Sequence, residues 1–145
     1  MRRCLFFSAL LLAAVGLVLV GDPLDSGSAV AEALQGPQVN ITVSCDGENA
    51  VDDVNVRPWT ARARRGNADQ LRWRLQPNSG VTSATIRPKA TSSWPFASTP
   101  PLTVNIGETV ESGSITGADG SYFYDIVVDC GSGPTVIDPR MDIRP

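Results

Sequence analysis

The sequence contains no histidine, and Lys89 is its only lysine. Histidine is the commonest general base in enzymes, a frequent metal ligand and the side chain that titrates near neutral pH. Its absence excludes a serine–histidine or cysteine–histidine pair, and no G-x-S-x-G motif is present. A hydrolase with two carboxylates is the remaining enzyme alternative, and it is disfavoured because so short a chain has no long insertion to build a cleft. We therefore expect no enzyme, no catalytic residue, no metal and no cofactor.

The N-terminal segment is typical of an export signal. Arg2 and Arg3 precede an apolar run from residue 5 to residue 20, and a small-x-small site ends at Ala31. We predict a signal peptide over residues 1–31, cleavage after Ala31 and a secreted or periplasmic mature protein. The alternative is a retained N-terminal anchor, because the apolar run approaches the length of about 17 residues that a membrane-spanning helix requires.

Cysteine is scarce, with three residues in the chain. Cys4 lies inside the predicted signal peptide, so Cys45 and Cys130 remain as an even pair in an oxidising compartment. Such a pair predicts one disulfide bond. A metal site would need more ligands, and a redox pair would favour C-x-x-C spacing.

Long amphipathic helices are also missing, and the apolar residues alternate with polar ones. The clearest example is Leu71, Trp73 and Leu75, which are separated by arginines. Residues 122–128 are apolar on both faces except at Asp125, which is typical of a strand in the middle of a sheet. Strands are expected at residues 39–44, 53–56, 70–76, 82–87, 102–106, 109–115, 121–129 and 135–143.

This pattern predicts an all-β domain over residues 38–145, preceded by a short tether at residues 32–37. Strands of five to eight residues with frequent turns indicate a two-sheet Greek-key sandwich or a small barrel. Pro139 predicts that the last strand lies at an edge or carries a bulge, because proline has no N–H to donate to a ladder.

The order of short elements resembles the cupredoxin-like family, whose sandwich is shared by blue copper proteins and by exported relatives without copper. The matching residues are Val54, Val56, Pro58, Gly66, the segment 71–75 with Trp73, Ile86, Pro88, Pro95, Phe96, the segment 120–124, and Ile137, Asp138, Pro139, Met141 and Ile143. The resemblance implies a cupredoxin-like fold, and an immunoglobulin-like sandwich is the alternative.

The chain departs from the copper-binding members of that family. A blue copper centre needs two imidazoles and a thiolate. There is no histidine, the family's cysteine position is taken by Asp125 and Ile126, and Met141 would have no ligand set to complete. The resemblance therefore implies a copper-free exported protein.

Arginines suggest an anion-binding face. If residues 60–64 and 70–75 pair as a hairpin, Arg62, Arg64, Arg72 and Arg74 share one outer face, and Ala61 and Ala63 leave room inside for Trp73. The ligand would be an envelope polysaccharide, a lipid headgroup or, against our overall expectation, a nucleic acid. In a cupredoxin-like arrangement these strands belong to opposite sheets and the face is split. A solvated strand face without a partner is the further alternative.

Two other features have competing interpretations. The acidic residues Asp46, Glu48, Asp52 and Asp53 suggest a calcium site or a solvated turn. Trp94 suggests an exposed aromatic platform or a plug that closes one end of the sandwich, which is the interpretation we favour.

The expected function is binding through a surface. We expect a non-enzymatic exported module whose partner is a protein or an envelope glycan. The alternative is a structural or accessory scaffold without small-molecule chemistry. Exposed aromatics on a concave face would favour the first, and a uniformly polar surface would favour the second.

Overall fold

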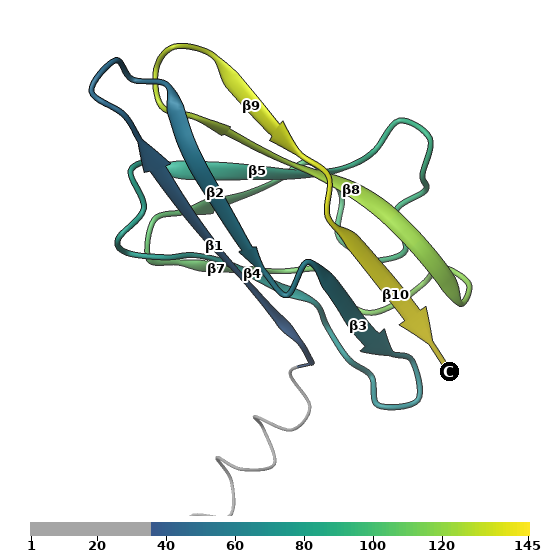
Figure 1. The fold of residues 1–145 in the computed structure, drawn as a ribbon. Helices are drawn as coiled ribbons and strands as arrows, with labels where there is room; N and C mark the ends of the chain where they lie inside the picture. The colour runs from purple at the N-terminus through teal and green to yellow at the C-terminus, as the bar shows by residue number, and fades with distance from the viewer. Residues whose placement is uncertain (1–35) are drawn as a thin grey trace, which may run out of the picture.

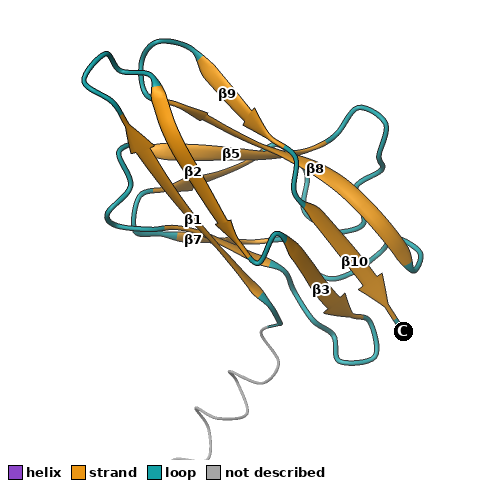
Figure 2. Ribbon diagram, viewed as in Figure 1, coloured by secondary structure: helices purple, strands orange, loops and turns teal. Residues whose placement is uncertain are grey.

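A computed structural model describes residues 36–145 as two stacked β-sheets, and no helix occurs among them (Figures 1 and 2). The small sheet contains β1 (Gln38–Cys45), β2 (Val51–Arg57), β4 (Arg72–Leu75) and β7 (Thr109–Glu111) in the order β2-β1-β4-β7. The large sheet contains β3 (Thr60–Arg64), β10 (Arg140–Arg144), β8 (Gly120–Asp129), β5 (Ser83–Pro88) and β6 (Leu102–Asn105) in the order β3-β10-β8-β5-β6, and β9 (Pro134–Ile137) also pairs with β8. The predicted two-sheet sandwich is confirmed.

The N-terminal predictions fall outside this part of the chain. The signal peptide at residues 1–31, its cleavage at Ala31 and most of the tether at residues 32–37 lie beyond the described residues. Within residues 36–145, no helix has the length and hydropathy needed to cross a membrane.

β8 lies in the middle of the large sheet, as its apolar sequence predicted. β5 pairs with one side of β8, and β9 and β10 pair with the other side. The single strand expected at residues 135–143 is thus two strands, which are separated at Asp138 and Pro139. The expectation that the last strand lies at an edge is wrong, because β10 lies between β3 and β8. The chain instead breaks its strand at Pro139, which has no N–H to donate to a ladder.

The expected hairpin between residues 60–64 and 70–75 does not form. β3 pairs in parallel with β10, and β4 pairs in parallel with β1. Side-chain oxygens satisfy backbone N–H groups at both ends of the segment where the chain changes sheets. The Arg64 N–H donates to Asp69 Oδ2 at 2.8 Å, and the Leu71 N–H donates to Ser112 Oγ at 2.9 Å, beside β7.

Trp73 joins the two layers at the centre of the core. Its ring is fully buried, stacks on Trp94 at 5.8 Å between centroids and meets Tyr124 of the large sheet edge-on at 5.7 Å. Burial raises the pKa of the Tyr124 phenol, an effect that the neighbouring Trp73 N–H only partly offsets. Trp94 is partly buried against this cluster, so it packs as a plug rather than standing out as a platform.

The predicted disulfide is present. Cys45 ends β1 of the small sheet, and Cys130 directly follows β8 of the large sheet; their Cα atoms are 5.8 Å apart. The adjoining loops are also tied together, because the Ser132 N–H donates to the Asn49 carbonyl at 2.9 Å. The bond therefore links both layers at one end of the sandwich.

Candidate functional site

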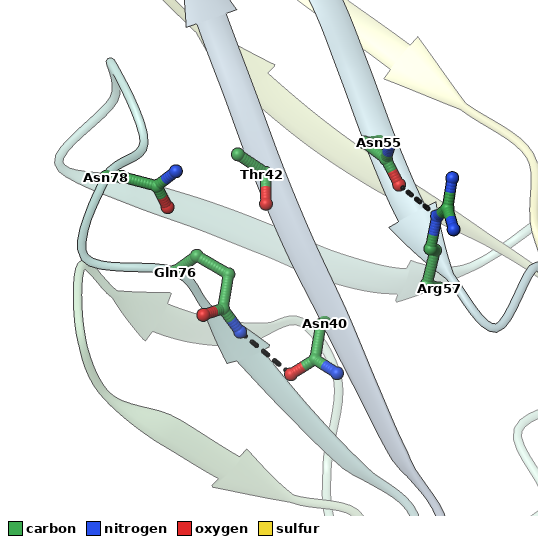
Figure 3. Close-up of a pocket in the computed structure, with 6 residues that line it drawn as sticks. All are labelled: Asn40, Thr42, Asn55, Arg57, Gln76 and Asn78. Carbon is green, nitrogen blue, oxygen red and sulfur yellow. Dashed lines mark hydrogen bonds between the residues drawn. The ribbon is translucent and has the colours of Figure 1, made fainter.

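The outer face of the small sheet carries an open hollow of about 500 Å³, which we call the amide groove (Figure 3). It is lined by Asn40 and Thr42 of β1, Asn55 and Arg57 of β2, and Gln76 and Asn78 beyond β4. Strand alternation produces this surface, because the residues between them, such as Ile41 and Val56, face the core. Four of the six lining residues are thus held on the paired strands β1 and β2, and Gln76 and Asn78 lie in the segment that follows β4.

Hydrogen bonds orient three of the four amide side chains of the groove, those of Asn40, Asn55 and Gln76. Asn40 Oδ1 accepts from the Nε2 groups of Gln38 and Gln76, both at 2.8 Å, and Asn55 Oδ1 accepts from Arg57 Nε at 3.1 Å. The Nδ2 groups of Asn40 and Asn55 have no hydrogen-bond partner within residues 36–145 and are available to a ligand.

The lining of the groove supplies binding groups but no acid–base pair. Arg57 is the only ionisable side chain among the six lining residues, so the lining holds no pair of titratable groups. Amides offer both donors and acceptors, which matches the hydroxyl groups of a sugar. The groove is therefore suited to recognition of a polar, hydroxyl-rich ligand.

The four predicted anion-binding arginines lie on two separate faces, so the proposed single face is wrong. Arg72 and Arg74 are on the outer face of the small sheet, where Arg74 is directly opposite Asn40. Arg62 and Arg64 are on the outer face of the large sheet, beside β10. The split follows from the sheet change at residues 65–71, which the cupredoxin-like alternative anticipated.

A different arginine cluster forms on the outer face of the large sheet. We call it the arginine face, and it consists of Arg62, Arg64, Arg140, Asp142 and Arg144. Sequence reasoning missed its β10 members because they come together with β3 only through a long-range parallel pairing. The one available signal was the alternating spacing of Arg140, Asp142 and Arg144 in the last strand.

Two further carboxylates, Asp46 and Asp138, accept hydrogen bonds from groups of the fold. Asp46 Oδ1 accepts from the N–H groups of Glu48 and Ala50 at 2.9 and 2.8 Å, which stabilises the β1–β2 turn. No cluster of three side chains suited to a metal ion occurs within residues 36–145. Asp138 accepts a hydrogen bond from the Lys89 ammonium, which lowers the pKa of that carboxyl.

Comparison with known proteins finds a likeness in structure and none in sequence. No protein-family model and no curated protein matches the chain. The structure is similar to the crystal structure of McoA multicopper oxidase from the hyperthermophile Aquifex aeolicus, with 19% sequence identity and a TM-score of 0.38. The match covers 76% of this chain and 27% of that one, so this chain spans about a quarter of the oxidase. A likeness at this TM-score carries no functional inference, and the sandwich is established by its strand pairing.

Proposed function

We propose that this protein is a non-enzymatic, copper-free exported module of cupredoxin-like type that binds a glycan through the amide groove. The observation that carries the proposal is the hydrogen-bonded array on the outer face of the small sheet. Asn40 and Asn55 are oriented by neighbouring side chains, and each keeps an amide donor for a ligand. Preorientation of this kind reduces the entropy that binding must overcome.

A glycan suits the groove better than a protein partner does. Protein interfaces concentrate aromatic and other large apolar side chains at their centres. The six lining residues include none of these. Export is supported by the N-terminal sequence pattern and by a disulfide, which persists in oxidising compartments.

The experiment is a glycan-array screen of the purified exported chain, followed by titration with the best oligosaccharide. The double variant Asn40→Ala/Asn55→Ala removes the two oriented amides and should weaken binding by about 5-fold to 150-fold, because each lost hydrogen bond contributes about 0.5–1.5 kcal/mol. The matched control is Asn67→Ala/Asn105→Ala, two exposed asparagines outside the groove, and it should bind like the parent chain.

Two results would contradict the proposal. Equal binding by both double variants would place the glycan elsewhere. A folded parent chain that binds no glycan on the array would favour the alternative, an accessory scaffold or a protein-binding module.

A further inference from the structure

The arginine face combines like charges that the fold itself brings together. Arg64 of β3 lies directly opposite Arg144 of β10 in the parallel register, and Arg62 lies opposite Asp142. Like charges at directly opposed positions destabilise a sheet. These arginines lie on the outer face of the sheet, so packing of the core does not account for their charge.

Asp142 is the single side-chain carboxylate within this cluster. It lies 4.0 Å from Arg62, 3.4 Å from Arg140 and 3.6 Å from Arg144, and it accepts a hydrogen bond from the Ser121 hydroxyl at 2.9 Å. Its side chain is only 9% exposed, whereas that of Arg62 is 68% exposed. The carboxylate therefore works as a buried anchor that holds exposed guanidinium groups around it.

Neighbouring carboxylates do not neutralise the arginine face. Asp119 pairs with Arg65 at 3.3 Å, and Asp125 pairs with Arg87 at 3.3 Å. Arg64 has no carboxylate partner among residues 36–145. Three guanidinium groups thus share the Asp142 carboxylate and Arg64 has none among the described residues, which leaves a local excess of positive charge on a chain whose formal net charge is −3.

The excess charge borders a hollow. Arg62, Arg64 and Arg144 line a depression of about 310 Å³, and Arg144 also borders a second depression of about 240 Å³ with Ser121 and Asp142. Guanidinium groups bind oxyanions through paired, charge-assisted hydrogen bonds. The first depression has the volume and the donors for one sulfate-, phosphate- or carboxylate-bearing unit.

An aromatic side chain lies on the same face. Phe123 of β8 is directly opposite Arg140 and is 46% exposed. Arg140 and Arg144 are separated along β10 by about 13 Å, given a rise of about 3.3 Å per residue. A ligand that contacts both Phe123 and the Arg144 depression must therefore be extended, and sugar rings can pack on the aromatic surface.

We propose that the arginine face binds an acidic polysaccharide, with an oxyanion held by Arg62, Arg64 and Arg144 and a sugar ring on Phe123. This site lies on the sheet opposite the amide groove and does not depend on the function proposed for that groove.

The test is titration of the purified exported chain with dextran sulfate, neutral dextran and sodium sulfate. The variant Arg62→Gln/Arg64→Gln should weaken dextran sulfate binding at least about tenfold, because charge-assisted hydrogen bonds to the oxyanion are lost. The control Arg72→Gln/Arg74→Gln removes the same charge from the opposite sheet and should change the affinity less than about twofold. If the first double variant does not fold, the single Arg64→Gln variant replaces it, and it should weaken dextran sulfate binding more than Arg74→Gln does.

A second variant tests whether the site contacts a sugar ring of the polymer in addition to the oxyanion. Phe123→Ser should weaken binding of dextran sulfate and leave any binding of sodium sulfate unchanged. Equal losses in the two arginine variants would show non-specific attraction and overturn the proposal. Three further results would overturn the proposal. Dextran sulfate could bind no tighter than neutral dextran, or sodium sulfate could bind as an adventitious ion only while dextran sulfate does not bind. Single-stranded DNA could also bind as tightly as dextran sulfate.

Discussion

The amide groove and the arginine face are outer surfaces of the same sandwich, yet they differ in chemistry. The groove presents neutral amides oriented by hydrogen bonds, and the arginine face presents guanidinium groups around one buried carboxylate. Both sheets obey the same alternation, which fixes the inward residues by their packing around Trp73. The outward residues are free of that requirement, so the binding chemistry of each face depends on which strands are neighbours.

Loss of the disulfide is expected to lower the free energy of unfolding more than any other change considered below, because the bond links the layers that carry the two faces. Cys45 and Cys130 are separated by 85 residues in sequence. Cys45→Ala/Cys130→Ala should lower the free energy of unfolding by up to about 4.5 kcal/mol, since the unfolded chain regains its loop entropy. Urea unfolding followed by tryptophan fluorescence measures the change. A loss below about 1 kcal/mol would show that the layers are held together without the bond.

Removal of the charge on Asp142, the anchor of the arginine face, is expected to lower the free energy of unfolding by a smaller amount. Asp142→Asn removes the charge that faces Arg62, Arg140 and Arg144 and should cost about 1–3 kcal/mol of unfolding free energy. Asp53→Asn, an exposed position on the outer face of the small sheet, should change it by less than about 0.5 kcal/mol. Denaturant unfolding at low and high sodium chloride compares them. The unfolding free energy lost in Asp142→Asn should become smaller as salt is added, because screening weakens repulsion between the arginines. Equal losses in Asp142→Asn and Asp53→Asn would show that Asp142 does not stabilise the arginine face.

The smallest effect concerns the Lys89–Asp138 pair of the large sheet. The hydrogen bond from Lys89 lowers the pKa of Asp138 below its ordinary value of 3.8. A carboxyl with a lowered pKa in the folded state adds stability above its ordinary pKa and loses that contribution as the pH falls through the lowered value. The thermal midpoint of Lys89→Gln should therefore lie slightly below that of the parent chain at pH 6 and converge with it towards pH 2. A difference that persists unchanged at pH 2 would contradict this account.

The sequence predicted those parts of the fold that depend on local pattern. Alternation at Leu71, Trp73 and Leu75 identified three fully buried side chains, and compartment chemistry identified the bond between Cys45 and Cys130. These predictions held because burial of one strand face is encoded within a few residues.

Strand partners were harder to predict because they depend on residues far apart in the chain. A hairpin was expected between residues 60–64 and 70–75, since neighbouring strands often pair. Their actual partners are β10 and β1. The arginine face could not be assembled from sequence for the same reason, and neither could the amide groove, whose six side chains are contributed by β1, β2 and the segment beyond β4.

The position of β10 between β3 and β8 has a consequence for the order of assembly. β3 has no strand partner other than β10 within residues 36–145, so it can enter a sheet only after the much later residues 140–144 have been synthesised. Until then, both of its hydrogen-bonding edges are open to other chains. The large sheet can therefore be completed only after the last strand has been made.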